Sequence, residues 1–380
     1  MKVYLDNAAT TAMDDRVIES MLPFMRNHFG NPSSVHSHGR EVRNAIEKSR
    51  KKVAELLNVT PSEIFFTSGG TEADNTAIIS GIESHGLTHA ITSPIEHHAV
   101  LHTLEVCEIK GHIQLSMLNV DEKGVIDFQQ LEDLLKANPK SLISLMHANN
   151  EIGNINDLER IGSLAREYGA FFHSDTVQTM GHYAHDLKNL PVDSIVAGAH
   201  KFHGPKGAGF LFVRKDKKIH PFIHGGAQER NMRGGTENVI GIIGVAKALE
   251  IAYEEMAEHQ SQIVAVKKHF IKNLNQEIPG VTFNGLSGDV ENSLYTVLNV
   301  SLPPSEANRG MLLFNLDLAG ISASGGSACS SGATVGSHVL RALNHQPERD
   351  AVRFSFSRFT TIDEVDYTIS QLKELYTVEA

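Results

Sequence analysis

The chain has 380 residues, a formal net charge of −11 at pH 7 and a hydrophobic content of 41%. This length predicts roughly two domains of about 150 residues each, and the hydrophobic content is enough for packed cores. The negative charge argues against nucleic acid as a main partner, because phosphate backbones bind basic surfaces. No apolar run reaches the roughly 18 residues that a membrane-spanning helix needs, and the first residues lack the apolar stretch of a signal peptide. We therefore expect a cytoplasmic protein without a membrane partner.

The only two cysteines, Cys107 and Cys329, stand in different surroundings. One possible bridge in a chain of this size does not make a disulfide scaffold, so a reducing compartment fits best. Cys107 falls on an expected helix among Leu104, Val106 and Ile109, and we interpret it as a small core residue. The histidines match no HExxH spacing and no Cys/His ligand set, so we expect no metal site.

The first half of the chain predicts alternating helices and strands. Residues 6–11 are small and polar, which is typical of a loop or an ordered arm. Helices are expected over 14–28 and 39–57, separated by a break at 30–34 and by a loop that holds His36 and His38. Strands are then expected at 64–67, 89–92, 113–118, 142–146 and 170–173, with helices at 68–84, from 96, at 127–137 and at 158–168. This alternation predicts an α/β fold with a largely parallel sheet that helices cover on both faces. Ligands bind such sheets at the carboxyl ends of the strands.

The second half begins with two strands that flank a tight turn. The first strand starts near Ile195, and the second covers residues 210–213. Lys201 falls at the end of the first strand. Residues 237–277 form one long helical tract or two helices in series, which often links domains. A smaller α+β unit follows, with strands at 281–283, 296–302 and 352–356 and helices at 306–318 and 363–375. We expect a large domain over 15–250 and a small one over 251–380, with the arm 1–14 packing near the small one.

Two features of the first domain suit a phosphorylated aldehyde. Apolar neighbours would partly desolvate Lys201 and so favour its neutral amine, the form that makes a Schiff base. The segment 68–71 lies between a strand and a helix, where free backbone N–H groups, the helix dipole and the Thr71 hydroxyl can bind a phosphate. The alternatives are a surface lysine beside a basic turn and an ordinary helix cap at Thr71.

Further polar residues follow the expected strands. Asp175 could hold a protonated ring nitrogen, while Gln178 donates to a ring oxygen. His97 or His98 could lie flat on an aromatic ligand or move a proton. The alternatives are an Asp that caps the next turn and a surface histidine.

Two C-terminal features add to this set. Arg353 and Arg358 bracket a short strand, where an arginine could clamp a carboxylate; the alternative is a surface ion pair. At 323–332, glycines and serines surround Cys329. This composition predicts a flexible loop that presents a thiol, whose attack needs an electropositive neighbour or a proton acceptor.

Together these residues resemble a pyridoxal phosphate enzyme of the class V aminotransferase fold (fold type I), and with Cys329 a cysteine desulfurase of the NifS/IscS type. The resemblance covers nearly the whole chain. It lies in the segments at 4–11 (YLDNAATT), 30–34 (GNPSS), 67–72 (TSGGTE), 149–153 (NNEIG), 204–207 (GPKG), 233–236 (RGGT), 326–329 (GSAC) and 353–355 (RFS), and in the pair His200-Lys201.

The resemblance implies a role for each matching residue. Lys201 would bind pyridoxal 5'-phosphate covalently and then move the substrate Cα proton, with His97 stacked on the ring and assisting. The cofactor would further be held by Gly70, Thr71, Asn150, Asp175, Gln178 and His200, with Thr236 reaching in from the partner subunit of a homodimer. Substrate binding would fall to Asn31, Asn150 and Arg353.

The implied reaction converts L-cysteine to L-alanine and leaves a persulfide on Cys329 for a sulfur acceptor such as an iron–sulfur cluster scaffold. Alternatives are a selenocysteine lyase, a class V aminotransferase, and a scaffold that has lost catalysis. The chain departs from the family twice. Gly198 replaces a hydroxyl residue three positions before the lysine, which removes one phosphate donor. The segment after Cys329 lacks the Glu-Pro pair that often precedes Ser-His-Val-Leu in the family.

Overall fold

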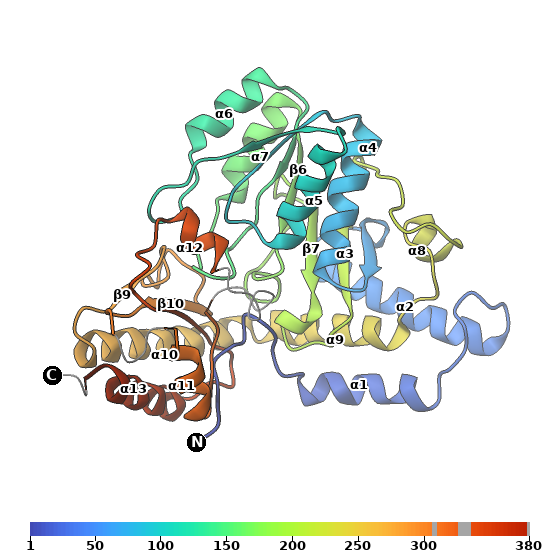
Figure 1. Cartoon of the computed structure of the whole chain (residues 1–380). Helices are drawn as coiled ribbons and strands as arrows, with labels where there is room; N and C mark the ends of the chain where they lie inside the picture. The colour runs from blue at the N-terminus through green and yellow to red at the C-terminus, as the bar shows by residue number, and fades with distance from the viewer. Residues whose placement is uncertain (306–309, 326–335, 378–380) are drawn as a thin grey trace.

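A central sheet of seven strands organises the N-terminal two thirds of the protein (Figure 1). The computed structural model describes residues 1–305, 310–325 and 336–377. The strand order is β2-β8-β7-β6-β5-β3-β4. The bounds are β2 (Ile64–Thr67), β3 (His89–Thr92), β4 (Gln114–Met117), β5 (Leu142–Ser144), β6 (Phe171–Asp175), β7 (Ser194–Gly198) and β8 (Gly209–Val213). Pairing from β4 through β7 is parallel, and β8 runs antiparallel to both β7 and β2. The predicted largely parallel sheet is confirmed.

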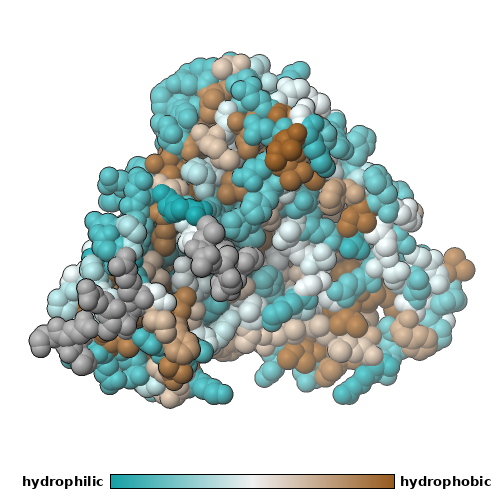
Figure 2. Space-filling model, viewed as in Figure 1, coloured by the Kyte–Doolittle hydropathy of each residue, from teal (hydrophilic) through white to brown (hydrophobic). Residues whose placement is uncertain are grey.

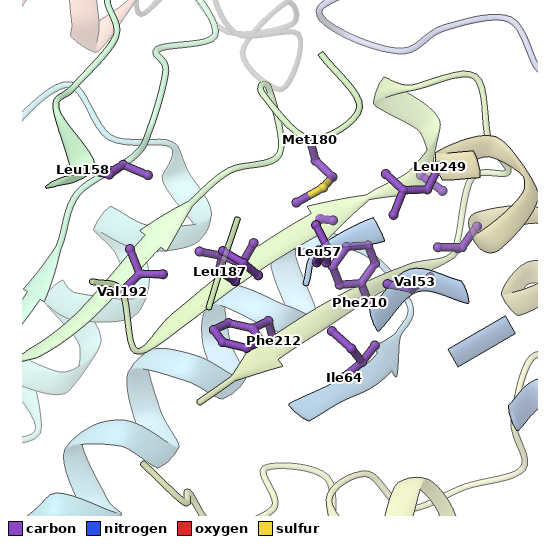
Figure 3. Close-up of a cluster of buried hydrophobic side chains, with 14 of the residues drawn as sticks. Val53, Leu57, Ile64, Leu158, Met180, Leu187, Val192, Phe210, Phe212 and Leu249 are labelled. Carbon is purple, nitrogen blue, oxygen red and sulfur yellow. The ribbon is translucent and has the colours of Figure 1, made fainter. Parts of the chain in front are cut away.

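Alternate side chains of the strands enter two hydrophobic cores, one on each face of the sheet. Phe210 and Phe212 of β8 lie beside Val53 and Leu57 in the first core (Figure 3). This core includes side chains of α1 (Asp15–Arg26), α2 (Ser37–Leu56), α6 (Phe128–Ala137), α7 (Leu158–Tyr168) and α9 (Val239–Glu254). Leu211 of β8 points into the second core, built with α3 (Gly70–Asn75), a π-helical segment (Thr76–Ser80), α4 (Gly81–His85) and α5 (His98–Ile109). Both faces are therefore covered, as the apolar strand sequences require.

Side-chain caps set where several of these helices begin. Asp14, Asp127 and Asp157 each accept a hydrogen bond from a backbone N–H in the first turn of α1, α6 and α7. Such caps satisfy donors that have no partner inside the helix. Gly169 ends α7 in the left-handed region at φ 67°, where a glycine carries no steric cost. Cys107 lies in the second core, as expected.

The C-terminal part is built on a three-stranded antiparallel sheet. Its order is β12-β10-β9, with β9 (Thr282–Phe283), β10 (Val297–Ser301) and β12 (Ala351–Ser355). The other elements are α10 (Met256–Glu277), α11 (Leu312–Leu318), β11 (Ile321–Ser322), α12 (His338–Ala342) and α13 (Ile362–Thr377). The N-terminal strand β1 (Val3–Tyr4) pairs with β11, and the Val3 and Leu5 side chains belong to the core of this part. A domain boundary at residue 250 stays a prediction.

The tract 237–277 is two helices in series, α9 and α10, broken at Glu255, which confirms one of the two expected alternatives. Other expected elements need correction. His38 lies inside α2 rather than in a loop, because the imidazole of His36 caps the helix by accepting from the Gly39 N–H. Lys201 lies one turn beyond its strand, in the 3-10 turn η3 (Ala199–Lys201). Within the helix expected over 306–318, Gly310 and Met311 form a turn, with Gly310 at φ 71°, and α11 begins at Leu312; residues 306–309 lie outside the described ranges.

The short element α8 (Gln228–Asn231) has no counterpart among the expected elements. Glu229, Arg230 and Asn231 all have positive φ angles, of 44°, 58° and 67°. Such backbone costs roughly 1–2 kcal/mol per residue outside glycine. The buried Glu229 carboxylate stabilises it by accepting hydrogen bonds from Arg50 and from the Phe66 N–H.

Apolar side chains are exposed on the face that Figure 2 shows, including the lower right part over α1 and the segment that leads to α2. Met25, Phe29 and Val35 are 61%, 81% and 85% exposed. Within the described ranges, none of the helices combines the length and apolar character needed to cross a bilayer.

Candidate active site

A cavity of about 210 Å³ opens at the carboxyl ends of the central strands. Nine of the predicted site residues line it: Gly70, Thr71, His97, Asn150, Asp175, Gln178, His200, Lys201 and Arg353. They come from segments that follow β2, β3, β5, β6 and β7, and from β12. The sheet therefore brings together residues that are far apart in the sequence, at the edge where parallel α/β sheets bind ligands.

The Lys201 amine lies against the N-terminal arm. Its Nζ donates to the carbonyl oxygens of Ala8 and Ala9, the latter at 2.9 Å. Gln178 Nε2 donates to the same Ala8 oxygen at 3.1 Å. Because η3 directly follows β7, the side chain of Lys201 leaves the sheet at its carboxyl edge and enters the cavity.

The Asp175 carboxyl group ends β6 and is 7% exposed. Burial raises its pKa to about 6, while the N–H of Val177, which donates at 2.8 Å, and the Lys201 charge act against that rise. A group poised in this way takes up a proton or pairs with a cation in response to a bound ligand.

The His97 imidazole caps α5 and faces the same cavity. Its Nδ1 accepts from the Ala99 N–H at 3.1 Å, so the acceptor role of that nitrogen is set by the backbone. Burial, with the Lys201 charge, lowers its pKa to about 4, and the ring is neutral at physiological pH. The neighbouring His98 ring instead lies 4.5 Å from that of His338.

The start of α3 forms one corner of the cavity. Gly69 has φ 150°, a conformation that L-residues with side chains rarely adopt, and a Cβ on Gly70 would lie only 2.7 Å from Val177 Cγ2. His200 borders this corner, and its Nδ1 lies 3.2 Å from Thr10 Oγ1. Backbone N–H groups at a helix start favour an anion such as a phosphate.

Arg353 supplies the buried cation of the cavity. Its side chain is 1% exposed, with Nη1 donating to the Asn150 carbonyl oxygen at 2.9 Å and Nη2 to Asp6 Oδ1 at 2.8 Å. Its Nε has no hydrogen-bond partner among the described residues. The other arginine of the motif, Arg358, pairs with Asp14 instead and does not line the cavity.

Three predicted site residues are not among those that line the cavity. Asn31 is exposed between α1 and α2, where its Oδ1 accepts from the Ser33 N–H. Thr236 is exposed and lines a separate hollow that includes Ser68 and Arg233. Cys329 lies outside the described residues. The roles of these three stay predictions.

The cavity also contains groups that sequence reasoning did not single out. Asp74 lies one turn beyond Gly70; burial and the Asp175 charge raise its pKa well above its usual range, and its Oδ1 lies 3.2 Å from His173 Nε2. The sequence signal that could have revealed Asp74 is its position one helical turn after Gly70. The Ala8 and Ala9 carbonyl groups had no side-chain signal at all, only their place in the 4–11 motif.

These residues fit a pyridoxal phosphate group. An amine, a buried carboxyl group, a neutral imidazole and a glycine-rich helix start all lie around one cavity. The unpartnered Arg353 Nε adds a buried donor that a ligand carboxylate could satisfy. The described residues contain no cluster of three His, Cys, Asp or Glu side chains placed to hold a metal ion.

Comparison with known proteins gives a consistent family. The model of the family aminotransferase class-V matches residues 3–368. Cysteine desulfurase IscS of Dictyoglomus turgidum is 43% identical over 378 residues, which cover 98% of this chain and 94% of that protein. A solved NifS-like protein is 38% identical with a TM-score of 0.90, covering 99% of this chain and all of the other. The solved structure of SspA in complex with cysteine is 31% identical with a TM-score of 0.81, covering 95% and 100% of the two chains. The chain therefore belongs to the class V aminotransferase family, and within it to the group of the cysteine desulfurases.

Proposed function

We propose that this protein is a pyridoxal phosphate-dependent cysteine desulfurase. It converts L-cysteine to L-alanine and transfers the sulfur to Cys329. The observation that carries the proposal is the meeting of Lys201, Asp175 and Arg353 around one cavity of about 210 Å³. An amine, a ring-nitrogen partner and a carboxylate receptor are the three groups that an amino-acid substrate and this cofactor require. Relatives named cysteine desulfurase over nearly the full length support the assignment.

Bound pyridoxal phosphate supplies an aldehyde for the amino group of the substrate and a ring that accepts electron density from its Cα. Asp175 holds the ring nitrogen in its protonated form, since the negative carboxylate and the cation stabilise each other in a buried site. Gly70, Thr71 and His200 hold the phosphate at the start of α3. His97 and Gln178 orient the ring.

Lys201 Nζ moves the proton of the substrate Cα. Two carbonyl oxygens of the arm, those of Ala8 and Ala9, accept from this amine in the structure. They stabilise its charged form after it has taken the proton, because a carbonyl oxygen accepts from an ammonium group. Arg353 and Asn150 fix the substrate carboxylate, so that the amine faces the Cα–H bond.

Cys329 receives the sulfur. Its thiolate forms a bond to the substrate sulfur, the Cβ–S bond breaks, and the electron pair of that bond passes to the carbon. Protonation then gives alanine and a persulfide on Cys329. Atoms balance, since one thiol and cysteine become one persulfide and alanine, and no external oxidant is needed.

The proposed partners are a second copy of the chain and a sulfur acceptor such as an iron–sulfur cluster scaffold. Thr236 is exposed, and the proposal assigns it to the phosphate site of the partner subunit. The exposed Met25, Phe29 and Val35 support an interface, because large apolar side chains gathered on a surface favour burial against a partner. Asn31, in the same segment, is assigned to substrate binding. We also assign the protein to the cytoplasm.

The test uses purified holoenzyme supplied with L-cysteine, with alanine and sulfide assayed and the cofactor absorption band recorded. We expect the band to shift and alanine to form. Lys201→Ala abolishes both changes. Cys329→Ser retains the spectral shift but loses alanine formation. The matched control, Cys107→Ser, shows the same spectral shift and the same alanine formation as the wild-type protein. A Cys329→Ser variant with full activity would overturn the proposal and favour a transaminase.

A further inference from the structure

The substrate-binding arginine already has an anionic partner within the protein. Arg353 Nη2 donates to Asp6 Oδ1 at 2.8 Å, and the two side chains are 1% and 20% exposed. Asp6 belongs to the N-terminal arm, while Arg353 lies near the C-terminal end of the chain on β12. A buried guanidinium without a counterion would destabilise the fold strongly. Asp6 therefore balances the charge of an otherwise very costly buried cation.

The pair is held from the backbone on both sides. The Asp6 backbone forms a bridge with Ser355, whose N–H donates to the Leu5 carbonyl oxygen at 2.7 Å. The Arg353 N–H donates to the Ser324 carbonyl oxygen at 2.6 Å. These backbone contacts hold the two residues next to each other, so we expect Asp6 to remain near the guanidinium when a ligand enters.

We propose that Asp6 limits the affinity of the Arg353 site for the α-carboxylate that substrate and product share. The inference rests on the proposed function. The empty pair is neutral, and an entering carboxylate finds the Arg353 charge already compensated and a second anion beside it. The remaining donors of Arg353, among them Nε, orient the carboxylate through hydrogen bonds, while Asp6 weakens its electrostatic hold.

This arrangement suits turnover. L-Alanine carries the same carboxylate as L-cysteine, so an arginine with no counterion would hold the product as firmly as the substrate. A carboxylate contact that is equally strong in the substrate complex and in the transition state lowers KM but does not accelerate the chemical step. By weakening this uniform term, Asp6 lets alanine leave the site.

The test is a titration of the holoenzyme with L-alanine, followed through the cofactor absorption band. Asp6→Asn keeps the shape and an acceptor oxygen but removes the charge. We expect the Kd for L-alanine to fall about ten-fold, which equals about 1.4 kcal/mol, because Asp6 is partly exposed and therefore partly screened. Asp6→Ser, which also removes the charge, changes the Kd in the same direction. Asp6→Glu keeps the negative charge, so its Kd for L-alanine should equal that of the wild-type protein.

Ethylamine is the matched ligand, since it is alanine without its carboxylate, and its Kd should be the same in all four proteins. An unchanged or raised Kd for L-alanine in both Asp6→Asn and Asp6→Ser would overturn the inference. So would an equal change for ethylamine, which would point to a general loosening of the arm. Binding of alanine is measured independently of turnover. A wild-type protein that makes no alanine from cysteine would refute the proposed function, while the Asp6 comparison still decides the inference.

Discussion

A Cβ atom added to Gly198 would lie 3.6 Å from the backbone nitrogen of Gly70, at the start of α3. The same atom would be 3.4 Å from His200 Cδ2, which is ordinary contact, and Gly198 has φ −122°, which any residue adopts. The position can therefore take a side chain that faces the proposed phosphate corner.

Gly198→Ser should tighten binding of pyridoxal phosphate. The new hydroxyl group adds a donor to a charged acceptor, and such a hydrogen bond contributes about 1.5–3 kcal/mol. We expect the Kd of the cofactor, measured by titration of the cofactor-free protein, to fall at least ten-fold. Gly198→Ala, which fills the same space without a donor, should leave the Kd nearly unchanged. Equal behaviour of the two variants would show that the hydroxyl group reaches no phosphate.

Cofactor binding should depend on the ionisation of Asp175. Burial raises the pKa of this carboxyl group to about 6 in the empty site, so it is charged above that pH and neutral below it. Affinity for a protonated ring should therefore weaken as the pH falls through about 6. The cofactor phosphate also titrates near pH 6, so the quantity to measure is the ratio of the Kd values of Asp175→Asn and wild type at each pH. The ratio should be large above pH 6 and shrink below it; a constant ratio would rule out this role.

The buried pair between Arg50 and Glu229 should dominate the stability of the strained α8 segment. Two hydrogen bonds join the side chains, at 2.6 and 2.9 Å, and each side chain is 2% exposed. Glu229→Gln leaves the guanidinium without its buried counterion and should cost about 3–5 kcal/mol of unfolding free energy. Glu47→Gln removes the exposed partner of the same arginine and should cost at most about 1 kcal/mol. Similar losses for the two variants in urea unfolding would contradict this account.

Lys267 should make stability rise with pH. It is buried in the C-terminal part, with Nζ donating to Ser293 Oγ and the Leu294 carbonyl oxygen. Burial lowers its pKa from 10.5 to about 7. Between these values the unfolded chain holds a proton that the folded chain has lost, so this group's contribution to stability increases with pH across that window and is lowest below pH 7. Lys267→Met should remove this part of the slope when unfolding midpoints are compared over the window. Parallel profiles would show that the amine is charged in the folded protein.

Local pattern predicted the central sheet because its strands are short apolar runs bounded by polar turns. The bounds of β2 and β3 agree with those expected, since each run ends where a polar segment begins. The pairing of β1 with β11 involves two residues on each side, too few for any periodicity. The left-handed turn at 229–231 contains no glycine and therefore gave no signal.

The site was predictable where its residues end strands or begin helices. Asp175 ends a strand, His97 caps the start of a helix and Lys201 follows a strand by one turn, and chain order alone places such positions at one edge of a parallel sheet. The ion pair of Asp6 with Arg353 joins the two ends of the chain and depends on how the arm lies along β12. Every residue type has a backbone carbonyl oxygen, so the sequence gives no sign that those of Ala8 and Ala9 are special. Only the folded arm reveals that Lys201 contacts them.

The central claim is that sulfur passes from L-cysteine to Cys329, and a single-turnover experiment tests it most directly. Holoenzyme in excess is mixed with L-cysteine, quenched with an alkylating reagent and digested. The mass of the peptide that contains Cys329 is then measured by mass spectrometry. The account predicts one additional sulfur atom on that peptide, one alanine per sulfur, and no addition to the peptide of the buried Cys107. Alanine formed with no added sulfur on Cys329 would contradict it.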